Sequence, residues 1–362
     1  MKKIGLMCTL GLWAFSVFSQ PMKVSGIKEV MVRTAEWQLV HPVPNESILT
    51  WVHAPFYLGL LDLYDVTGEK KYLDTLHAIG EKKSWRPLPH ILDPDNIAVL
   101  DAFLRTYEKC KDPAILSETK WVLDIILSRG TKQAMVSLKN NPYFKEWMTW
   151  CDALYMSPPV LARMTKLTGE KKYLDYMNTM WWKTSDYLYS KEDSLIYRDD
   201  RYIGKLSKNG KKIFWGRGNG WVLAGLARVL EVLPQDSPYR GRFEQQYREM
   251  AYKILSLQQP EGLWTCSLLD PEYLSNGESS CSTLFCYALA YGLNNDLLDK
   301  EYLPQIWRAW NALCNNINAE GRLGYVQQVA GDPFPFHENE WHIYATGAFL
   351  MAGKQMIEVI EK

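Results

Sequence analysis

Two tryptophans and an arginine stand together among glycines near the middle of the sequence, in the run Trp215-Gly-Arg-Gly-Asn-Gly-Trp221. Glycine and asparagine tolerate backbone angles that other residues avoid, so the run predicts a tight loop at residues 218–220 that leads into a helix. The loop would present Trp215, Arg217 and Trp221 together. Aromatic rings cover the apolar face of a sugar and a guanidinium pairs with a carboxylate, so the pattern suits an acidic sugar. The alternative is a glycine-rich loop beside core tryptophans.

Asp152 is the first candidate for acid–base chemistry. Its neighbours in the sequence are apolar or aromatic: Trp150, Cys151, Leu154, Tyr155 and Met156. Such surroundings would raise the pKa of its carboxyl group and keep a proton available for donation. The alternative is a helix N-cap, since an aspartate before an apolar run is a common start signal.

The charge balance excludes some partners. The 362 residues carry 41 basic and 41 acidic side chains, with no basic stripe, so we expect neither nucleic acid nor a membrane surface as a partner. Residues 1–19 begin with Lys2-Lys3 and continue as an apolar run to Phe18, which predicts a secretory signal peptide and a soluble exported protein, periplasmic or secreted. No linker divides residues 20–362, which we expect to form a single domain.

No metal or cofactor is expected. His337 and His342 are five residues apart, whereas a metalloprotease helix places its two histidines at i and i+4. Six cysteines follow the predicted signal peptide, and their spacing resembles neither a zinc site nor a disulfide scaffold. We expect most of them to be buried free thiols: Cys110, Cys151, Cys266, Cys281, Cys286 and Cys314.

An octapeptide that occurs twice indicates how the helices are joined. Thr67–Asp74 and Thr168–Asp175 both read Thr-Gly-Glu-Lys-Lys-Tyr-Leu-Asp. Each copy predicts a helix that ends at glycine and a second helix whose Tyr-Leu pair faces inward. Such hairpins cannot bury their apolar faces alone, so they must stack.

Apolar periodicity predicts about a dozen helices in roughly six hairpins and no convincing strands. A closed toroid of hairpins fits this pattern better than an open solenoid. Long connections at 83–95, 130–151, 190–218, 258–278 and 316–340 are the expected places for function. The predicted helices span 27–39, 48–66, 70–82, 96–110, 114–129, 152–167, 171–189, 219–232, 240–257, 279–293, 300–315 and 341–361.

The sequence resembles glycoside hydrolase family 105, the unsaturated rhamnogalacturonyl hydrolases, and more distantly the family 88 unsaturated glucuronyl hydrolases. The resemblance covers nearly the whole chain after residue 19. Its most specific motifs are 215–221 and Trp150-Cys-Asp-Ala-Leu-Tyr-Met-Ser-Pro-Pro159. Weaker matches are at 93–99, 278–289 and 341–350.

The resemblance implies an all-α (α/α)6 barrel that removes a 4,5-unsaturated uronic acid from the non-reducing end of lyase-generated oligosaccharides. In such enzymes an aspartic acid protonates the C4=C5 enol ether and water adds at C5. Asp152 matches that general acid and base. Asp95 matches a second family aspartate, although Asp93 is close enough to take its place, and the alternative for Asp95 is capping of a helix that starts at Asn96.

The resemblance also assigns sugar-binding roles. Arg217 would hold the substrate carboxylate or an adjacent hydroxyl, Trp215 and Trp221 would wall the sugar, and Trp51 and Tyr155 are further pocket candidates. Arg198 stands where several members have a histidine. Because arginine does not exchange protons at ordinary pH, we expect Arg198 to be a charge anchor and the ligand to be more anionic, or else Arg198 to be a surface residue paired with a neighbouring aspartate.

Two other functions stay open at this point. One is an ordinary inverting glycosidase, which needs two carboxylates about 6.5–9.5 Å apart; Asp95 and Asp152 could supply them. The other is a non-catalytic exported sugar-binding protein. The parent polysaccharide is also open, with rhamnogalacturonan, ulvan, pectic side chains and glycosaminoglycans as candidates.

Overall fold

A computed structural model describes residues 22–132, 135–144 and 146–362. The predicted signal peptide at 1–19 lies outside the described residues. Six helices form an inner ring in which each contacts the next and the last returns to the first. In order around the ring they are α2 (Ala54–Thr67), α5 (Val99–Cys110), α8 (Pro158–Thr168), α10 (Gly216–Val232), α12 (Ser279–Asn294) and α14 (Ile343–Glu361).

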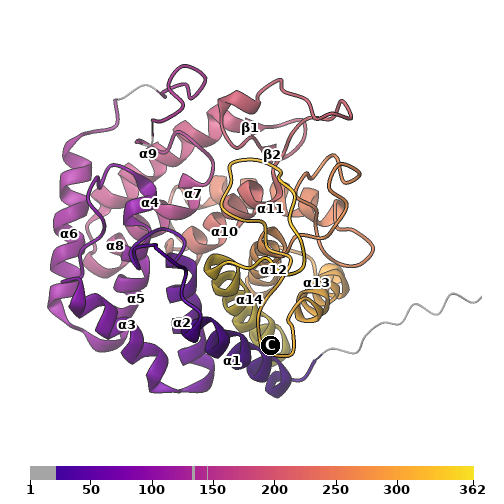
Figure 1. Cartoon of the computed structure of the whole chain (residues 1–362). Coiled ribbons are helices and arrows are strands. Elements are labelled where there is room, and N and C mark those ends of the chain that lie inside the picture. Colours follow the sequence, from indigo (N-terminus) through magenta and orange to yellow (C-terminus); the bar gives the residue numbers. More distant parts are fainter. Residues whose placement is uncertain (1–21, 133–134, 145) are drawn as a thin grey trace, which may run out of the picture.

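A second layer of helices surrounds this ring. Each outer helix packs on inner neighbours, and Figure 1 shows the pairs following one another around the molecule from indigo to yellow. The outer helices are α1 (Val24–Val40), α3 (Lys70–Lys82), α6 (Pro113–Ser128), α9 (Lys171–Leu188), α11 (Arg240–Ser256) and α13 (Leu303–Asn315). The closed ring of six hairpins confirms the predicted toroid.

The remaining elements are short. Two four-residue helices, α4 (Pro94–Ile97) and α7 (Ala153–Met156), precede α5 and α8. The 3-10 turns are η1 (Asp200–Tyr202) and η2 (Lys300–Tyr302). Strands β1 (Tyr189–Ser190) and β2 (Leu195–Ile196) form an antiparallel pair within the long connection that follows α9.

Burial explains the difference between inner and outer sequences. In α12 every residue but Leu293 is buried, because an inner helix is enclosed by the barrel interior, its ring neighbours and the outer layer. In α13 only one face is buried, formed by Ile306, Trp307, Ala309, Trp310 and Leu313. A helix that is buried on all sides is typical of a protein core, and one with a single apolar stripe is typical of a surface.

The repeated octapeptide forms the joint that the sequence predicts. Gly68 and Gly169 follow α2 and α8 with φ of 74° and 75°, the left-handed conformation that glycine adopts without strain. Outer helices α3 and α9 begin two residues later, and Tyr72 and Tyr173 are fully buried. These two-residue joints place α2 and α8 antiparallel to the outer helices that follow them.

A buried ion cluster ties three inner helices together. Asp101 of α5 accepts hydrogen bonds from Arg163 of α8 at 2.7 Å and from Arg228 of α10 at 2.5 Å. Burial alone would raise the pKa of Asp101, but the two guanidinium groups hold it below its ordinary value. The cluster satisfies charges that would otherwise be costly inside the barrel.

Candidate active site

The chain connections differ in length at the two ends of the barrel. Connections from inner to outer helices are short, such as 68–69, 111–112 and 169–170. Those from outer to inner helices are longer, and they include the five long segments that the sequence marks as well as residues 41–53. The inner helices therefore begin at one common end, beneath the long connections. Helix N-termini carry partial positive charge, so this end favours an anionic ligand.

Asp152 lies at this end, immediately before α7. Its side chain does not cap the helix, so the N-cap alternative is not what the structure shows. Its Oδ2 accepts a hydrogen bond from the Cys151 thiol at 3.3 Å and lies 3.7 Å from Nε of Arg198. Burial, and after it the Asp152 charge, raise the pKa of Cys151 well above its usual value, so the thiol keeps its proton. No partner is found for Oδ1 among the described residues, which leaves this oxygen available to a ligand.

Arg198 faces Asp152 and is held from several sides. Its Nη1 donates to Asp199 at 2.7 Å, and its carbonyl accepts from the Cys151 amide at 2.8 Å. Burial alone would lower the pKa of Arg198, but the carboxylates of Asp152 and Asp199 raise it. The Arg198–Asp199 pair that the sequence offered as an alternative is present, and the same guanidinium also touches the candidate acid.

Asp95 is brought to the same region. It lies in α4, which packs against α7, the short helix that Asp152 immediately precedes. The helix begins at Pro94 rather than at Asn96, and its cap is Asp93, whose Oδ1 accepts from the Asp95 amide at 3.0 Å. Asp93 thus takes the capping role, while Asp95 stays the candidate for the second carboxylate.

The prediction of a tight loop at 218–220 is wrong, because α10 already begins at Gly216 and the glycines form its first turns. A Cβ added at Gly216 would meet the Thr265 carbonyl oxygen at 2.7 Å, and at Gly218 or Gly220 it would lie 3.1 Å from Cys151 or Leu284. Glycine is needed here because α10 approaches its neighbours closely, and not because the backbone turns.

Arg217 is buried and is used within the protein. Its Nη1 donates to the Gln327 carbonyl at 2.6 Å and to the Tyr344 hydroxyl at 2.7 Å, and its Nη2 donates to the Gln328 carbonyl at 2.8 Å. Trp215 is also buried, and its Nε1 donates to the Gln327 side chain at 2.9 Å. In this conformation the two residues anchor the connection before α14, and their contact with a sugar stays a prediction.

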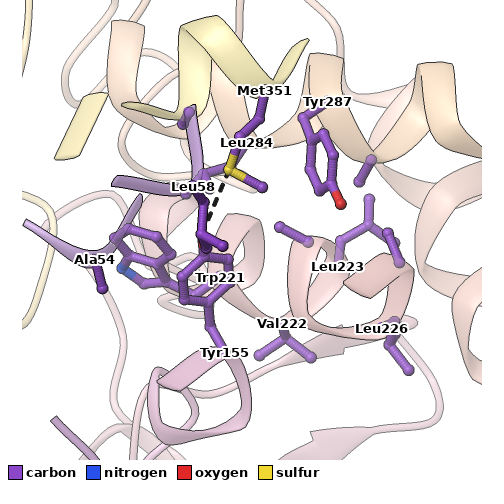
Figure 2. Packing of buried hydrophobic residues seen from close by; sticks show 14 of the residues in the cluster. Ala54, Leu58, Tyr155, Trp221, Val222, Leu223, Leu226, Leu284, Tyr287 and Met351 are labelled. Carbon is purple, nitrogen blue, oxygen red and sulfur yellow. Dashed lines mark hydrogen bonds between the residues drawn. The ribbon is translucent and has the colours of Figure 1, made fainter. Parts of the chain in front are cut away.

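The other aromatic candidates form a chain beneath the site. Trp221 is 4.6 Å from Tyr155 and 6.0 Å from Trp51 between ring centroids. Figure 2 shows Trp221 and Tyr155 inside the buried cluster, with the Tyr155 hydroxyl directed at Met351 of α14. Trp51 alone of the three is partly exposed, so it is the ring best placed to meet a sugar.

Sequence reasoning did not identify Gln327 as a buried residue of the connection before α14, nor His53 and His342 as buried residues near the site. Gln327 is fully buried, and Glu278, the N-cap of α12, accepts from its amide at 2.9 Å. His53 and His342 precede α2 and α14, and burial lowers the pKa of His53 to about 4. Burial first, then Arg217 and His53, lower the pKa of His342 to about 3. The sequence did contain a signal for these buried positions, because each histidine directly precedes an apolar helical run.

The described residues contain neither a candidate metal site nor a candidate membrane-spanning helix. Within 22–362, apart from 133, 134 and 145, no three His, Cys, Asp or Glu side chains are grouped so that they could share a metal ion. In the same part of the chain, no helix has the length and apolar content that a membrane-crossing segment needs. The six cysteines are free, with Cys110 exposed and Cys314 half-buried, which confirms the predicted thiols.

Comparison with known proteins places the chain in a family. The model of Glycosyl Hydrolase Family 88 matches residues 24–360. The chain belongs to this family. The unsaturated 3S-rhamnoglycuronyl hydrolase of Formosa agariphila is 36% identical, over 93% of this chain and 92% of that protein. A protein of the same name from Alteromonas sp. (strain LOR) is 32% identical, over 94% and 88%.

A solved structure supports the same placement. The glycosyl hydrolase family 88 protein of Bacteroides vulgatus superimposes with a TM-score of 0.84 at 28% identity, over 93% of this chain and 99% of that one. This family 88 chain is therefore a glycoside hydrolase with the six-hairpin fold, as the resemblance implied.

Proposed function

We propose that this family 88 protein removes a 4,5-unsaturated uronic acid from the non-reducing end of lyase-generated oligosaccharides, with Asp152 as the proton donor. The observation that carries the proposal is the state of the Asp152 carboxyl group. One oxygen is held by Cys151 and Arg198, and the other has no partner among the described residues. This fixed orientation suits a group that must deliver a proton to one atom.

The proposed reaction is the one that the family resemblance implies, with Asp152 in the role of the acid. The Asp152 proton adds to C4 of the enol ether, which leaves a cation at C5 stabilised by the ring oxygen. Water adds its oxygen to C5 and returns a proton to the carboxylate of Asp152. The C5 hemiketal then opens, C1 becomes a hemiacetal, and its collapse releases the rest of the saccharide. The ring of inner-helix N-termini favours the uronate carboxylate at this end of the barrel.

The names of the two curated relatives suggest the substrate. Both are called unsaturated 3S-rhamnoglycuronyl hydrolases. We therefore propose, for this chain, an unsaturated uronic acid linked to rhamnose. We also propose export through residues 1–19, which mass spectrometry of the mature N-terminus in fractionated cells would check.

The test uses lyase-digested polysaccharides and the ultraviolet absorbance of the unsaturated acid. Wild-type protein should remove the absorbance from a rhamnose-containing digest, and Asp152→Asn should lower kcat by at least about 100-fold, the usual contribution of a general acid. Binding of the digest to Asp152→Asn, measured by calorimetry, controls for folding.

Other outcomes identify the alternatives. Release of sugar from saturated oligosaccharides would indicate an inverting glycosidase that uses Asp95 and Asp152. Binding without release of sugar from any substrate would indicate a non-catalytic protein. Either result would overturn the proposed reaction.

A further inference from the structure

The Cys151 thiol is the one direct hydrogen-bond donor to the Asp152 carboxyl group within the described part of the chain. It donates to Oδ2 over 3.3 Å. The Arg198 guanidinium lies beside the same oxygen, but its Nε is 3.7 Å away, is buried and makes no hydrogen bond to any described residue. Arg198 therefore acts on the carboxyl group through its charge, whereas Cys151 bonds to one particular oxygen.

The surroundings of Cys151 leave its thiol little else to do. The residue is fully buried, and burial raises the pKa of the thiol well above its usual value. A buried thiol that keeps its proton is neither a nucleophile nor a target for oxidation. It can still donate that proton in a hydrogen bond, and Oδ2 of Asp152 is its acceptor.

Contacts from three segments hold the thiol in this position. The Cys151 amide donates to the Arg198 carbonyl at 2.8 Å, and the Cys151 carbonyl accepts from the Leu154 amide at 3.0 Å in the turn that leads into α7. On the side of α10, a Cβ added at Gly218 would lie 3.1 Å from Sγ, so glycine leaves room for the sulfur atom. The donor, the acid and Arg198 are thus fixed relative to one another.

This arrangement makes the two oxygens of Asp152 unequal. A protonated carboxyl group carries its O–H on one oxygen and accepts at the other. A proton on Oδ2 would weaken both the bond from the thiol and the attraction of the Arg198 charge, so the proton belongs on Oδ1. Oδ1 has no partner among the described residues, and 12% of the Asp152 side chain stays exposed.

We propose that Cys151 is a positioning residue of this site, and that its hydrogen bond to Oδ2 keeps the transferable proton of Asp152 on Oδ1. The inference rests on the proposed function, in which Asp152 gives that proton to C4 and takes one back from water. Cys151 exchanges no proton itself, and because it is fully buried it does not touch the substrate.

The kinetic test follows the loss of ultraviolet absorbance from a lyase-digested, rhamnose-containing polysaccharide. Cys151→Ala should lower kcat about tenfold, because a hydrogen bond from a weak donor to a charged group is lost. KM should change less than about twofold, since an interaction with the acid and not with the sugar is removed. Cys151→Ser keeps a donor on the same Cβ and should restore kcat to within about threefold of wild type.

A matched control separates the hydrogen bond from packing. Cys286 is also fully buried, and its thiol makes no hydrogen bond to any described residue. Cys286→Ala removes the same atom from the protein interior and should leave kcat unchanged, even where it lowers the melting temperature as much as Cys151→Ala does.

Infrared spectroscopy tests the hydrogen bond without any turnover. The difference between the spectra of wild type and Cys151→Ala gives the S–H stretching band of Cys151, and the same difference for Cys286→Ala gives that of a thiol without a partner. The Cys151 band should lie at the lower frequency, because its acceptor is charged. In Asp152→Asn the band should move to higher frequency, since a neutral amide is the weaker acceptor.

The possible results separate this inference from the proposed function. With an active wild type, an unchanged kcat in Cys151→Ala contradicts the positioning role, and an equal loss in Cys151→Ala and Cys151→Ser assigns the effect to packing. If wild type removes absorbance from no digest, the proposed reaction itself fails, and the infrared band still decides whether Cys151 holds Oδ2. A Cys151 band at the frequency of Cys286 would exclude the hydrogen bond whatever the kinetics show.

Discussion

Acidification from pH 7 to pH 5 should destabilise this protein through His53 and His342, which lie buried and neutral at the N-termini of α2 and α14. Their folded-state pKa values are about 4 and about 3, against 6.5 for an unperturbed histidine. Because the unfolded chain takes up these protons first, the stability that the neutral rings contribute is fully present above pH 6.5. It declines as the pH falls through 6.5 towards the folded-state values.

The magnitude follows from the unfolded-state pKa. At pH 5 a histidine with a pKa of 6.5 in the unfolded chain favours unfolding by about 2 kcal/mol, because the folded ring is still neutral. This figure changes little whether the folded pKa is 3 or 4, since both lie below the pH of the measurement. Two histidines together give about 4 kcal/mol, a large fraction of the roughly 5–15 kcal/mol that stabilises a typical domain.

Urea unfolding followed by tryptophan fluorescence at pH 7 and pH 5 measures the effect. His342→Gln should lose about 2 kcal/mol less than wild type over this interval, whatever its stability at pH 7. Carboxylates also titrate over the interval, and the comparison of variant with wild type removes their contribution. His337→Gln, at an exposed ring, controls for the removal of a histidine as such. The same pH dependence in wild type and His342→Gln would refute the reasoning.

Two further predictions concern packing and buried charge. Gly225→Ala should destabilise the protein by about 1–3 kcal/mol and lower kcat, because its Cβ would meet the Leu154 carbonyl oxygen at 2.6 Å and push α10 away from the helix that follows Asp152. Gly241→Ala, with no atom within 4 Å of the added Cβ, should instead be neutral or stabilise by up to about 1 kcal/mol; urea unfolding compares the two. Asp101→Asn should cost about 3–5 kcal/mol in the same assay, because it leaves two buried guanidinium groups without their carboxylate.

The helices and their joints could be predicted because their causes are local. A glycine after an apolar run ends α2 and α8 in the same way at both copies of the octapeptide, and the inner and outer helices follow from periodicity. Two predicted helices are interrupted near the site. The segment 96–110 divides at Ala98, and 152–167 divides at Ser157, where Pro158 begins the next helix. Both breaks separate a short helix at a candidate aspartate from a long inner helix.

The partners of Arg217 could not be predicted in this way. Its guanidinium binds carbonyl groups 110 and 111 residues away in the sequence, and no local pattern encodes such a contact. The role of the glycines around Arg217 could not be predicted from the local sequence either. A glycine needed for a turn and a glycine needed for close packing look alike in a sequence, and the distinction depends on Cys151 and Leu284 of other segments. Asp152 and Arg198, in contrast, were identified by sequence and lie together in the structure.

Arg217 and Arg198 have different surroundings, and this difference affects how the site could recognise an acidic sugar. Arg217 is buried, and its hydrogen bonds fix the carbonyl groups of residues 327 and 328, so it shapes the wall before α14. Arg198 keeps a fifth of its side chain exposed and lies between Asp152 and the wall at Gly331. A cation that touches the candidate acid and stays partly exposed can respond to substrate charge, whereas one enclosed by carbonyl groups cannot. Exchange of Arg198 would therefore alter the reaction and the choice of substrate together, and exchange of Arg217 would first displace the wall.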